Sequence, residues 1–244
     1  MLERETLRSE ESRRYWDTHF DSETVTTVPR WSSVETGGSS PLTFDVQMPA
    51  DATAKLAVLA QSLSVPVKTL LLAAHLKVMS FISRQRGVVT GLIQNGRLEE
   101  VGGDTALGLF LNTVPFQLEL PEGNWVDLIR GTFAAEAAMI PHRRYPLSEL
   151  QKRRPGQPLF ETAFNFTHFH ILKSLEDFDE IKVMDMSGFG ETNFTLLASF
   201  DMDVNSNEVH LMLGYNQAEI PEDQIRTIGE YYNCLLYTSD AADE

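Results

Sequence analysis

Two alternating stretches in the last third of the chain restrict its fold most strongly. Apolar residues occupy every second position from Phe194 to Val204 and again from Val209 to Tyr215. A period of two is the pattern of a half-buried strand. The Asn-Ser-Asn between the stretches is typical of a turn. The sequence therefore predicts an antiparallel β-hairpin here, and with it a β-sheet.

Helical patterns interleave with further strand patterns along the chain. Helices are predicted at 9–20, 50–63, 66–86, 125–140 and 221–233, and strands at 42–48, 87–93, 113–120 and 161–169. The strand at 87–93 is nearly all apolar, which indicates burial on both of its faces. Because helices and strands alternate and one strand pair is antiparallel, we expect one α/β domain, a mixed β-sheet with packed helices.

Composition argues against several classes of function. Acidic residues outnumber basic residues by 35 to 20, for a net charge of −15 at pH 7. The electrostatic field of this negative charge repels phosphate backbones and anionic lipids, so we expect neither nucleic-acid nor membrane-surface binding. The first sixteen residues are charged and lack the apolar stretch of a signal peptide. No apolar run approaches the roughly 20 residues of a membrane-spanning helix. We expect a soluble, cytoplasmic protein.

The last eleven residues, Cys234–Glu244, do not continue the amphipathic pattern that precedes them. They resemble the translation of a transposon-based sequencing adaptor, and we interpret residues 234–244 as an artefact. The alternative is a natural flexible tail. If the segment is an artefact, the single cysteine is not native and the natural chain has no thiol chemistry.

Motifs for self-contained catalysis are missing from the sequence. The Gly-x-Gly at 188–190 lacks the third glycine of a nucleotide-binding loop, and there is no Gly-x-Ser-x-Gly or His-Glu-x-x-His. His168 and His170 would share one face of a strand, but no third ligand follows at a recognisable spacing, so we predict no metal site. His75 lies in an apolar helix and is interpreted as structural, either buried and hydrogen-bonded or exposed beside Lys77.

One basic cluster contrasts with the acidic chain. It consists of His142, Arg143, Arg144, Lys152, Arg153 and Arg154. Such a cluster can dock a phosphate group or an acidic partner surface. The alternative is a solvated turn whose charges pair with Glu149 and Glu161. The sequence leaves both interpretations open.

A set of motifs gives the most specific indication of the protein's function. A Gly-x-Phe-x-Asn-Thr segment is formed by Gly108, Phe110, Asn112 and Thr113. The same chain contains four further motifs. They are a Ser…Tyr-Trp helix near 9–20, a strand with a Gly-Arg-x-x-Glu turn at 88–100, a His-x-x-x-Pro-x-x-x-Leu stretch at 142–150, and a Pro-Leu-Phe strand near 158–160. In order and spacing this set resembles the C-terminal lobe of condensation domains of nonribosomal peptide synthetases, over about residues 9–233.

The resemblance implies a fold and a reaction. The fold would be like chloramphenicol acetyltransferase, with two lobes around a tunnel. A donor would arrive as a 4'-phosphopantetheine thioester on a carrier protein, and an acceptor amine on a second carrier protein. An adenylation domain would belong to the same assembly line. In the family, amide formation is attributed to a His-His-x-x-x-Asp-Gly motif on the N-terminal lobe. This chain has no His-His and no Asp-Gly pair, so we expect it to be inactive alone.

The resemblance also implies an organisation and a set of sites. Residues 1–40 would be the inter-lobe helix and linker, and residues 41–233 the C-terminal lobe. The implied tunnel residues are Gly108, Phe110, Asn112, Thr113 and Asn165, and the implied carrier-docking residues are Arg143, Arg144, Lys152, Arg153 and Arg154. The alternative for 108–113 is a turn that only shapes the fold, and for Asn165 an amide satisfied by the backbone.

The sequence departs from the family pattern at two places. Arg143 and Arg144 stand where the family often has acidic or amide residues, and the arginine usual after the Asn-Thr pair is absent. The subtype therefore stays open. Alternatives for the whole protein are a non-catalytic carrier-docking module, or an epimerisation or acyltransferase relative on the same fold.

Overall fold

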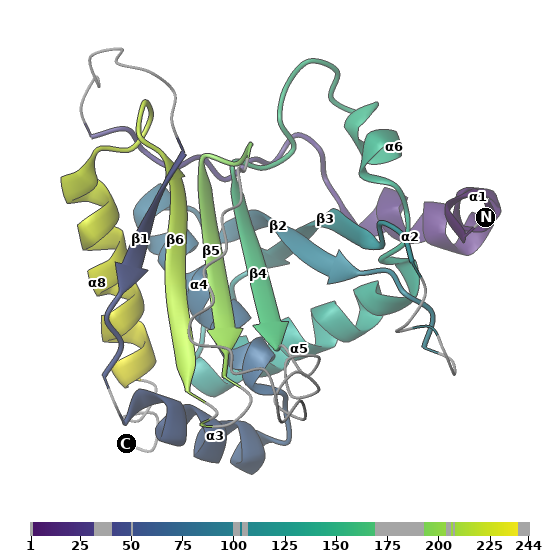
Figure 1. Cartoon of the computed structure of the whole chain (residues 1–244). Helices are drawn as coiled ribbons and strands as arrows, with labels where there is room; N and C mark the ends of the chain where they lie inside the picture. The colour runs from purple at the N-terminus through teal and green to yellow at the C-terminus, as the bar shows by residue number, and fades with distance from the viewer. Residues whose placement is uncertain are drawn as a thin grey trace, which may run out of the picture.

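A six-stranded β-sheet forms the centre of the computed structural model (Figure 1). The structure describes residues 2–31, 41–49, 51–99, 103, 107–168, 193–203, 206 and 208–238. The strands are β1 (Pro41–Val46), β2 (Gly87–Asn95), β3 (Leu111–Glu119), β4 (Thr162–His168), β5 (Leu196–Met202) and β6 (Val209–Asn216), in the order β1-β6-β5-β4-β2-β3. The β2–β4 and β4–β5 pairs are parallel and the others antiparallel. The predicted mixed sheet is confirmed.

The predicted hairpin is the antiparallel pair β5 and β6, with Leu196 opposite Tyr215 and Met202 opposite Val209. Its alternating apolar residues form one buried face. Leu196, Ala198, Phe200, Val209, Leu211, Leu213 and Tyr215 are each at most 3% exposed. The alternation in the sequence therefore reports which side of the sheet meets the core.

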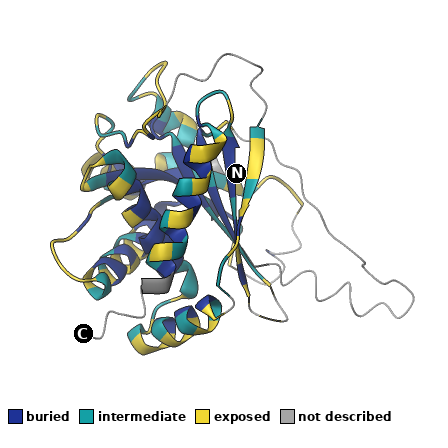
Figure 2. Ribbon diagram, turned by 90° about the vertical axis from the view of Figure 1, so that its left-hand side faces the viewer, coloured by how far each residue is buried: buried dark blue, intermediate teal, exposed yellow. Residues whose placement is uncertain are grey.

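Three of the described helices cover that buried face. The described helices are α1 (Leu2–Arg8), α2 (Glu10–His19), α3 (Ala52–Leu63), α4 (Val67–Ser83), α5 (Trp125–Met139), α6 (Leu147–Gln151) and α8 (Glu222–Thr238), with a 3₁₀ turn η1 (Ile140–His142). Figures 1 and 2 show α4, α5 and α8 together on one side of the sheet. No described element covers the opposite face, which we call the open face. Helix α4 lies between α5 and α8 and packs against β2 and β4, and Leu70–Leu76 are almost fully buried.

Side-chain caps explain where two of the helices begin. The Ser9 hydroxyl accepts a hydrogen bond from the Ser12 amide at the start of α2. Asn124 and Asp127 form a reciprocal capping box at the start of α5. Such caps satisfy amide groups that the first turn leaves unpaired.

Helix α8 ends later than the sequence predicts. The predicted face of Ile225, Ile228 and Tyr232 is at most 1% exposed. The helix, however, continues through Cys234 to Thr238, and Leu236 is 1% exposed in the core. The prediction that the helix stops at residue 233 is therefore wrong, because a further turn presents an apolar side chain to the same core.

Among the described residues, no single helix is long and apolar enough to cross a membrane, and α3 with α4 passes that test only as a pair bent by 106°. The described part of the chain also contains no group of three or more metal-ligating side chains.

Candidate functional site

Asn112 and Thr113 lie inside strand β3, and not in a turn as the alternative interpretation has it. Consecutive side chains of a strand point to opposite faces. Asn112 points toward the helices, where its Nδ2 donates to the carbonyl oxygens of Arg143 and Tyr145, both at 2.9 Å. The motif asparagine therefore joins β3 to the turn after α5, and both of its N–H donors are used within the chain.

Thr113 faces the open side of the sheet. Its partner in β2 is Ile93, and β2 pairs in parallel with β4 at Leu92 and Phe164. One residue further along, the same register puts Asn165 in the row of Ile93 and Thr113. The structure therefore brings Thr113 and Asn165 to one face, two strands apart, and places Asn112 on the other.

The Asn165 amide has side-chain partners. Its Nδ2 donates to Ser199 Oγ at 2.9 Å and to Thr167 Oγ1 at 3.2 Å. The prediction of backbone partners is wrong, because neighbouring positions of β4 and β5 place two hydroxyls on the same face. These polar side chains make the open face hydrophilic at this point.

The start of the Gly-x-Phe-x-Asn-Thr segment is tightly folded. Gly108 has φ +150°, and a Cβ there would lie 3.1 Å from the Phe110 ring. Only glycine adopts this backbone conformation without strain. The Phe110 carbonyl accepts a hydrogen bond from the Gly96 amide at 2.7 Å. The Arg97 guanidinium lies 4.5 Å from the centre of the Phe110 ring, a cation–π contact.

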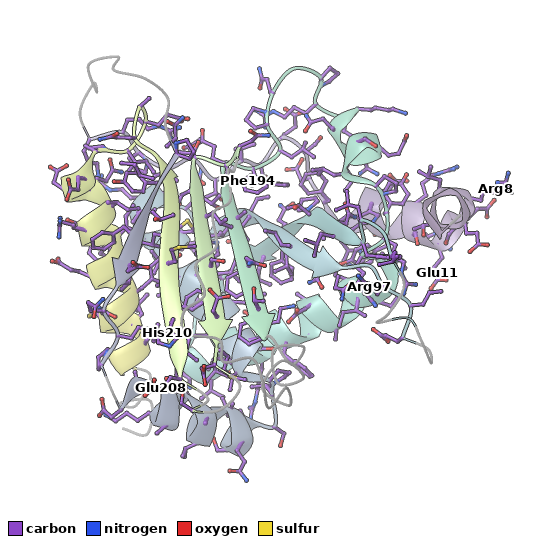
Figure 3. The ribbon with its side chains drawn as sticks, in the orientation of Figure 1. Arg8, Glu11, Arg97, Phe194, Glu208 and His210 are labelled. Carbon is purple, nitrogen blue, oxygen red and sulfur yellow. The ribbon has the colours of Figure 1, made fainter. Side chains whose placement is uncertain are left out.

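Three leucines of the same segment point to solvent. Leu107, Leu109 and Leu111 are 99%, 90% and 64% exposed, and we call them the leucine ridge. Exposed apolar side chains that cluster in this way mark an interaction surface more often than a bare solvent face. Leu111 begins β3, which is an edge strand of the sheet. Figure 3 shows Arg97 at this side of the molecule, and Glu208 and His210 at the other side.

The first part of the basic cluster holds the end of β2. Arg143 is only 8% exposed; its Nε donates to the Asn95 carbonyl at 3.0 Å and its Nη2 to Glu99 Oε1 at 2.7 Å. Arg144 donates to the carbonyl oxygens of Gly96 and Arg97, both at 2.7 Å. These two guanidinium groups are used largely for contacts within the chain.

The second part of the cluster holds helix α2. Arg153 donates to the Trp16 carbonyl at 2.7 Å and to the Asp17 carboxylate at 2.6 Å, and Arg154 donates to the Ser22 carbonyl at 3.1 Å. The turn between α5 and β4 thus links the N-terminal helix to the sheet.

The remaining lysine of the cluster stays on the surface. Lys152 pairs with Glu149 at 2.7 Å, as expected, and its side chain is 70% exposed. Glu161 pairs with Arg30 at 2.7 Å. The predicted pairing of Glu161 with the cluster is therefore wrong, because the segment before β1 brings its own arginine to this carboxylate.

The histidine of the cluster is a packing residue. His142 Nδ1 lies 3.0 Å from the Ser12 hydroxyl. The Tyr15 ring stacks between His142 at 4.3 Å and His19 at 4.4 Å, measured between ring centres. Burial lowers the pKa of His142, with the neighbouring Glu11 charge opposing that shift.

His75 takes the buried form of its structural interpretation. It is 0% exposed, with Nδ1 2.6 Å from the Tyr232 hydroxyl and Nε2 2.9 Å from Thr90 Oγ1. Burial lowers its pKa to about 3, so the ring is neutral at physiological pH. The side chain of His168 and the whole of His170 lie outside the described residues, as does the Gly-x-Gly at 188–190.

Sequence reasoning missed an acidic residue on the open face. Asp201 in β5 lies opposite His210 in β6. Burial raises the pKa of Asp201, while a hydrogen bond with Thr167 and the charge of His210 oppose the rise. Its position in the polar half of the hairpin alternation was the only signal in the sequence.

Comparison with known proteins gives consistent matches. The family model "Condensation domain" matches residues 3–238. The AMB antimetabolite synthetase AmbE of Pseudomonas aeruginosa is 36% identical over 169 residues, which cover 69% of this chain and 8% of that protein. Malpinin synthetase of Mortierella alpina is 31% identical over 137 residues, which cover 54% of this chain and 2% of that protein. The chain thus spans a small fraction of these relatives.

Solved structures show the same fold. The condensation domain of the monacolin K polyketide synthase MokA has a TM-score of 0.77 at 15% identity, over 98% of this chain and 60% of that one. Holo-AB3403, a four-domain nonribosomal peptide synthetase, has a TM-score of 0.79 at 16% identity, over 96% of this chain and 19% of that one.

Proposed function

The chain belongs to the condensation-domain family, and from that premise we propose that it is the C-terminal, acceptor-side part of an amide-forming condensation domain in a cytoplasmic nonribosomal peptide synthetase. The observation that carries the proposal is the family match across residues 3–238. The 36% identity to a synthetase of an antimetabolite and the shared fold of condensation domains support it.

In the proposed reaction an acceptor amine attacks the carbonyl carbon of a donor thioester. The C–N bond forms and the C–S bond breaks. The amine proton passes through a base to the sulfur, so that the pantetheine arm leaves as a thiol. A general base must lie within hydrogen-bond reach of that amine. This sequence has no His-His and no Asp-Gly pair, so in this proposal the base is supplied by residues outside these 244.

The contribution of this chain is a tunnel wall. We assign that wall to the open face, which carries Thr113, Asn165 and Asp201 and lacks a described helix. Gly108 and Phe110 shape its opening. The 4'-phosphopantetheine arm of a carrier protein would lie along this wall, within reach of the Thr113 hydroxyl. Asn112 contributes by holding β3 to the turn after α5.

Two surfaces are assigned to partners in the same synthetase. The leucine ridge would pack against the N-terminal lobe, because burying three exposed leucines removes a large apolar area from water. The exposed part of the basic turn, with Lys152 at 70% exposure, is the proposed contact for an acidic carrier protein. An adenylation domain would supply that carrier with its aminoacyl group.

The test is an amide-forming assay with aminoacyl and peptidyl groups on carrier proteins, read by mass spectrometry. We expect no product from this chain alone and product from a synthetase in which it follows a lobe containing His-His-x-x-x-Asp-Gly. Product from the chain alone would contradict the assignment of the base. If the complete domain binds both carriers and forms no amide, the proposed reaction is wrong.

A further inference from the structure

A pocket of about 470 Å³ lies where the end of α4, helix α8 and the segment before β1 meet. Its lining includes Lys77, Phe81 and Arg84 of α4 and its C-terminal cap, Tyr231 of α8, and Trp31. The volume falls within the range of small-molecule sites. The pocket is on the side of the sheet that carries α4 and α8, so the proposed condensation chemistry on the open face does not use it.

Aromatic rings form the apolar part of the pocket. Trp31 is 51% exposed and Phe81 is 63% exposed. The Phe81 ring meets Tyr231 edge to face, with 5.1 Å between the ring centres. Aromatic rings that gather at the surface of a hollow leave faces on which another planar ring can stack.

The exposed tryptophan stands on a fixed backbone. The Trp31 amide donates to Gln224 Oε1 at 3.3 Å, and Gln224 Nε2 donates to the Pro29 carbonyl at 2.5 Å. Gln224 is only 1% exposed, so a buried side chain of α8 holds this segment in place. A ring on an ordered backbone costs less entropy to use in binding than one on a mobile loop.

Two cations lie beside the rings. Lys77, Phe81 and Arg84 follow one another at intervals of four and three residues, a spacing that places side chains along one face of a helix. Lys77 and Arg84 are both exposed, and neither has an ion-pair partner in the described part of the chain. The residues that line the pocket include no acidic side chain. In a chain with a net charge of −15, these two positive charges are open to an anion from solution.

We propose that this pocket binds a planar aromatic anion. The aromatic ring stacks against Trp31 and Phe81, and the anionic group pairs with Lys77 and Arg84. Two sources share this chemistry, an aromatic carboxylate and an aromatic phosphate ester, because a guanidinium group pairs with either anion. The inference does not depend on the proposed amide formation.

The test is an NMR titration of the isotope-labelled 244-residue chain with 1-naphthylacetate, following the indole Nε1–H signal of Trp31. The ester 1-naphthyl phosphate represents the second source, and 2-(1-naphthyl)ethanol is the uncharged control. The Nε1 atoms of Trp16 and Trp125 are buried, so their signals serve as internal references.

We expect a saturable shift of the Trp31 signal with the anions and unchanged reference signals. The anions should bind about three- to tenfold more tightly than the alcohol, and the tighter anion identifies the source. The proposal is overturned if neither anion shifts the Trp31 signal, if the alcohol binds as tightly as both anions, or if all three tryptophan signals shift alike.

Variants separate the roles of charge and ring. Lys77→Gln and Arg84→Gln should each weaken anion binding about two- to fivefold and leave alcohol binding unchanged. Phe81→Ala should weaken the binding of anion and alcohol alike, about two- to tenfold. Arg8→Gln is the matched control, because it removes a positive charge from α1, at the side of the molecule away from α8 (Figure 3). If the Lys77→Gln/Arg84→Gln double variant still prefers the anions over the alcohol, the pairing with these two cations is wrong.

Discussion

Acid should destabilise this protein partly through a single buried histidine. His75 is fully buried and hydrogen-bonded to Tyr232 and Thr90, and burial lowers its pKa to about 3 from an ordinary value of 6.5. Between pH 6.5 and pH 3 the unfolded chain binds a proton at this ring and the folded chain does not. Falling pH therefore favours the unfolded state throughout this window.

The size of the effect follows from the two pKa values. Each pH unit below 6.5 costs about 1.4 kcal/mol, so this residue alone removes about 2 kcal/mol of the free energy of unfolding between pH 7.5 and pH 5.0. The loss reaches about 4 kcal/mol at pH 3. For a chain of this length, 2 kcal/mol corresponds to about 4–8 °C in Tm.

The assay compares urea unfolding of the wild type and His75→Gln at pH 7.5 and pH 5.0. Glutamine keeps a donor and an acceptor for the hydroxyls of Tyr232 and Thr90 but does not titrate. All other titrating groups are common to both proteins, so they cancel in the difference. The wild type should lose about 2 kcal/mol more than the variant on acidification. The reasoning would be refuted if the wild type and the variant lost the same free energy of unfolding on acidification, to within about 0.5 kcal/mol.

Three further substitutions test the contacts described above. Asn112→Ala should lower the free energy of unfolding by about 2 kcal/mol, since two carbonyl groups lose their donor. Thr113→Ala should lower it less; equal losses in urea unfolding would show that the Asn112 hydrogen bonds to the turn after α5 do not stabilise the fold. Arg153→Ala should speed amide hydrogen exchange in α2, whereas Lys152→Ala should not; protection unchanged in both variants would show that the arginine does not hold the helix. Gly91→Ala should destabilise by about 1–3 kcal/mol, because the new Cβ would lie 2.3 Å from a neighbouring phenylalanine ring; a Tm equal to that of the wild type would show that the ring moves aside.

The sequence predicts the elements whose pattern is local. Alternation identified the β5–β6 hairpin, and helical spacing identified the buried face of α8 with Ile225 and Tyr232. Both patterns arise because the side chains of a strand or a helix point toward the core at a fixed period, about 2 residues in a strand and about 3.6 in a helix. The helix end at Thr238 was missed because the residues after 233 have a composition that suggested no further helical turn.

The partners of the basic cluster could not be predicted in this way. Arg143 and Arg144 donate to backbone carbonyls of residues 95–97, more than forty positions earlier in the chain. Every residue has a carbonyl group, so no sequence pattern marks the one that a distant guanidinium will reach. The direction of Asn112 was also undetermined, because it depends on β3 beginning at Leu111.

The turn between α5 and β4 has a mechanical consequence. Arg153 of this turn donates a hydrogen bond to α2, and Arg144 donates one to the backbone just after β2. Asn112 of β3 in turn donates to a carbonyl group of the turn. Helix α2 and strand β3, which are about a hundred residues apart in the chain, are thereby coupled by one connecting segment. We therefore expect a movement of α2 to be passed through this turn to β3, the strand that begins at Leu111 of the leucine ridge.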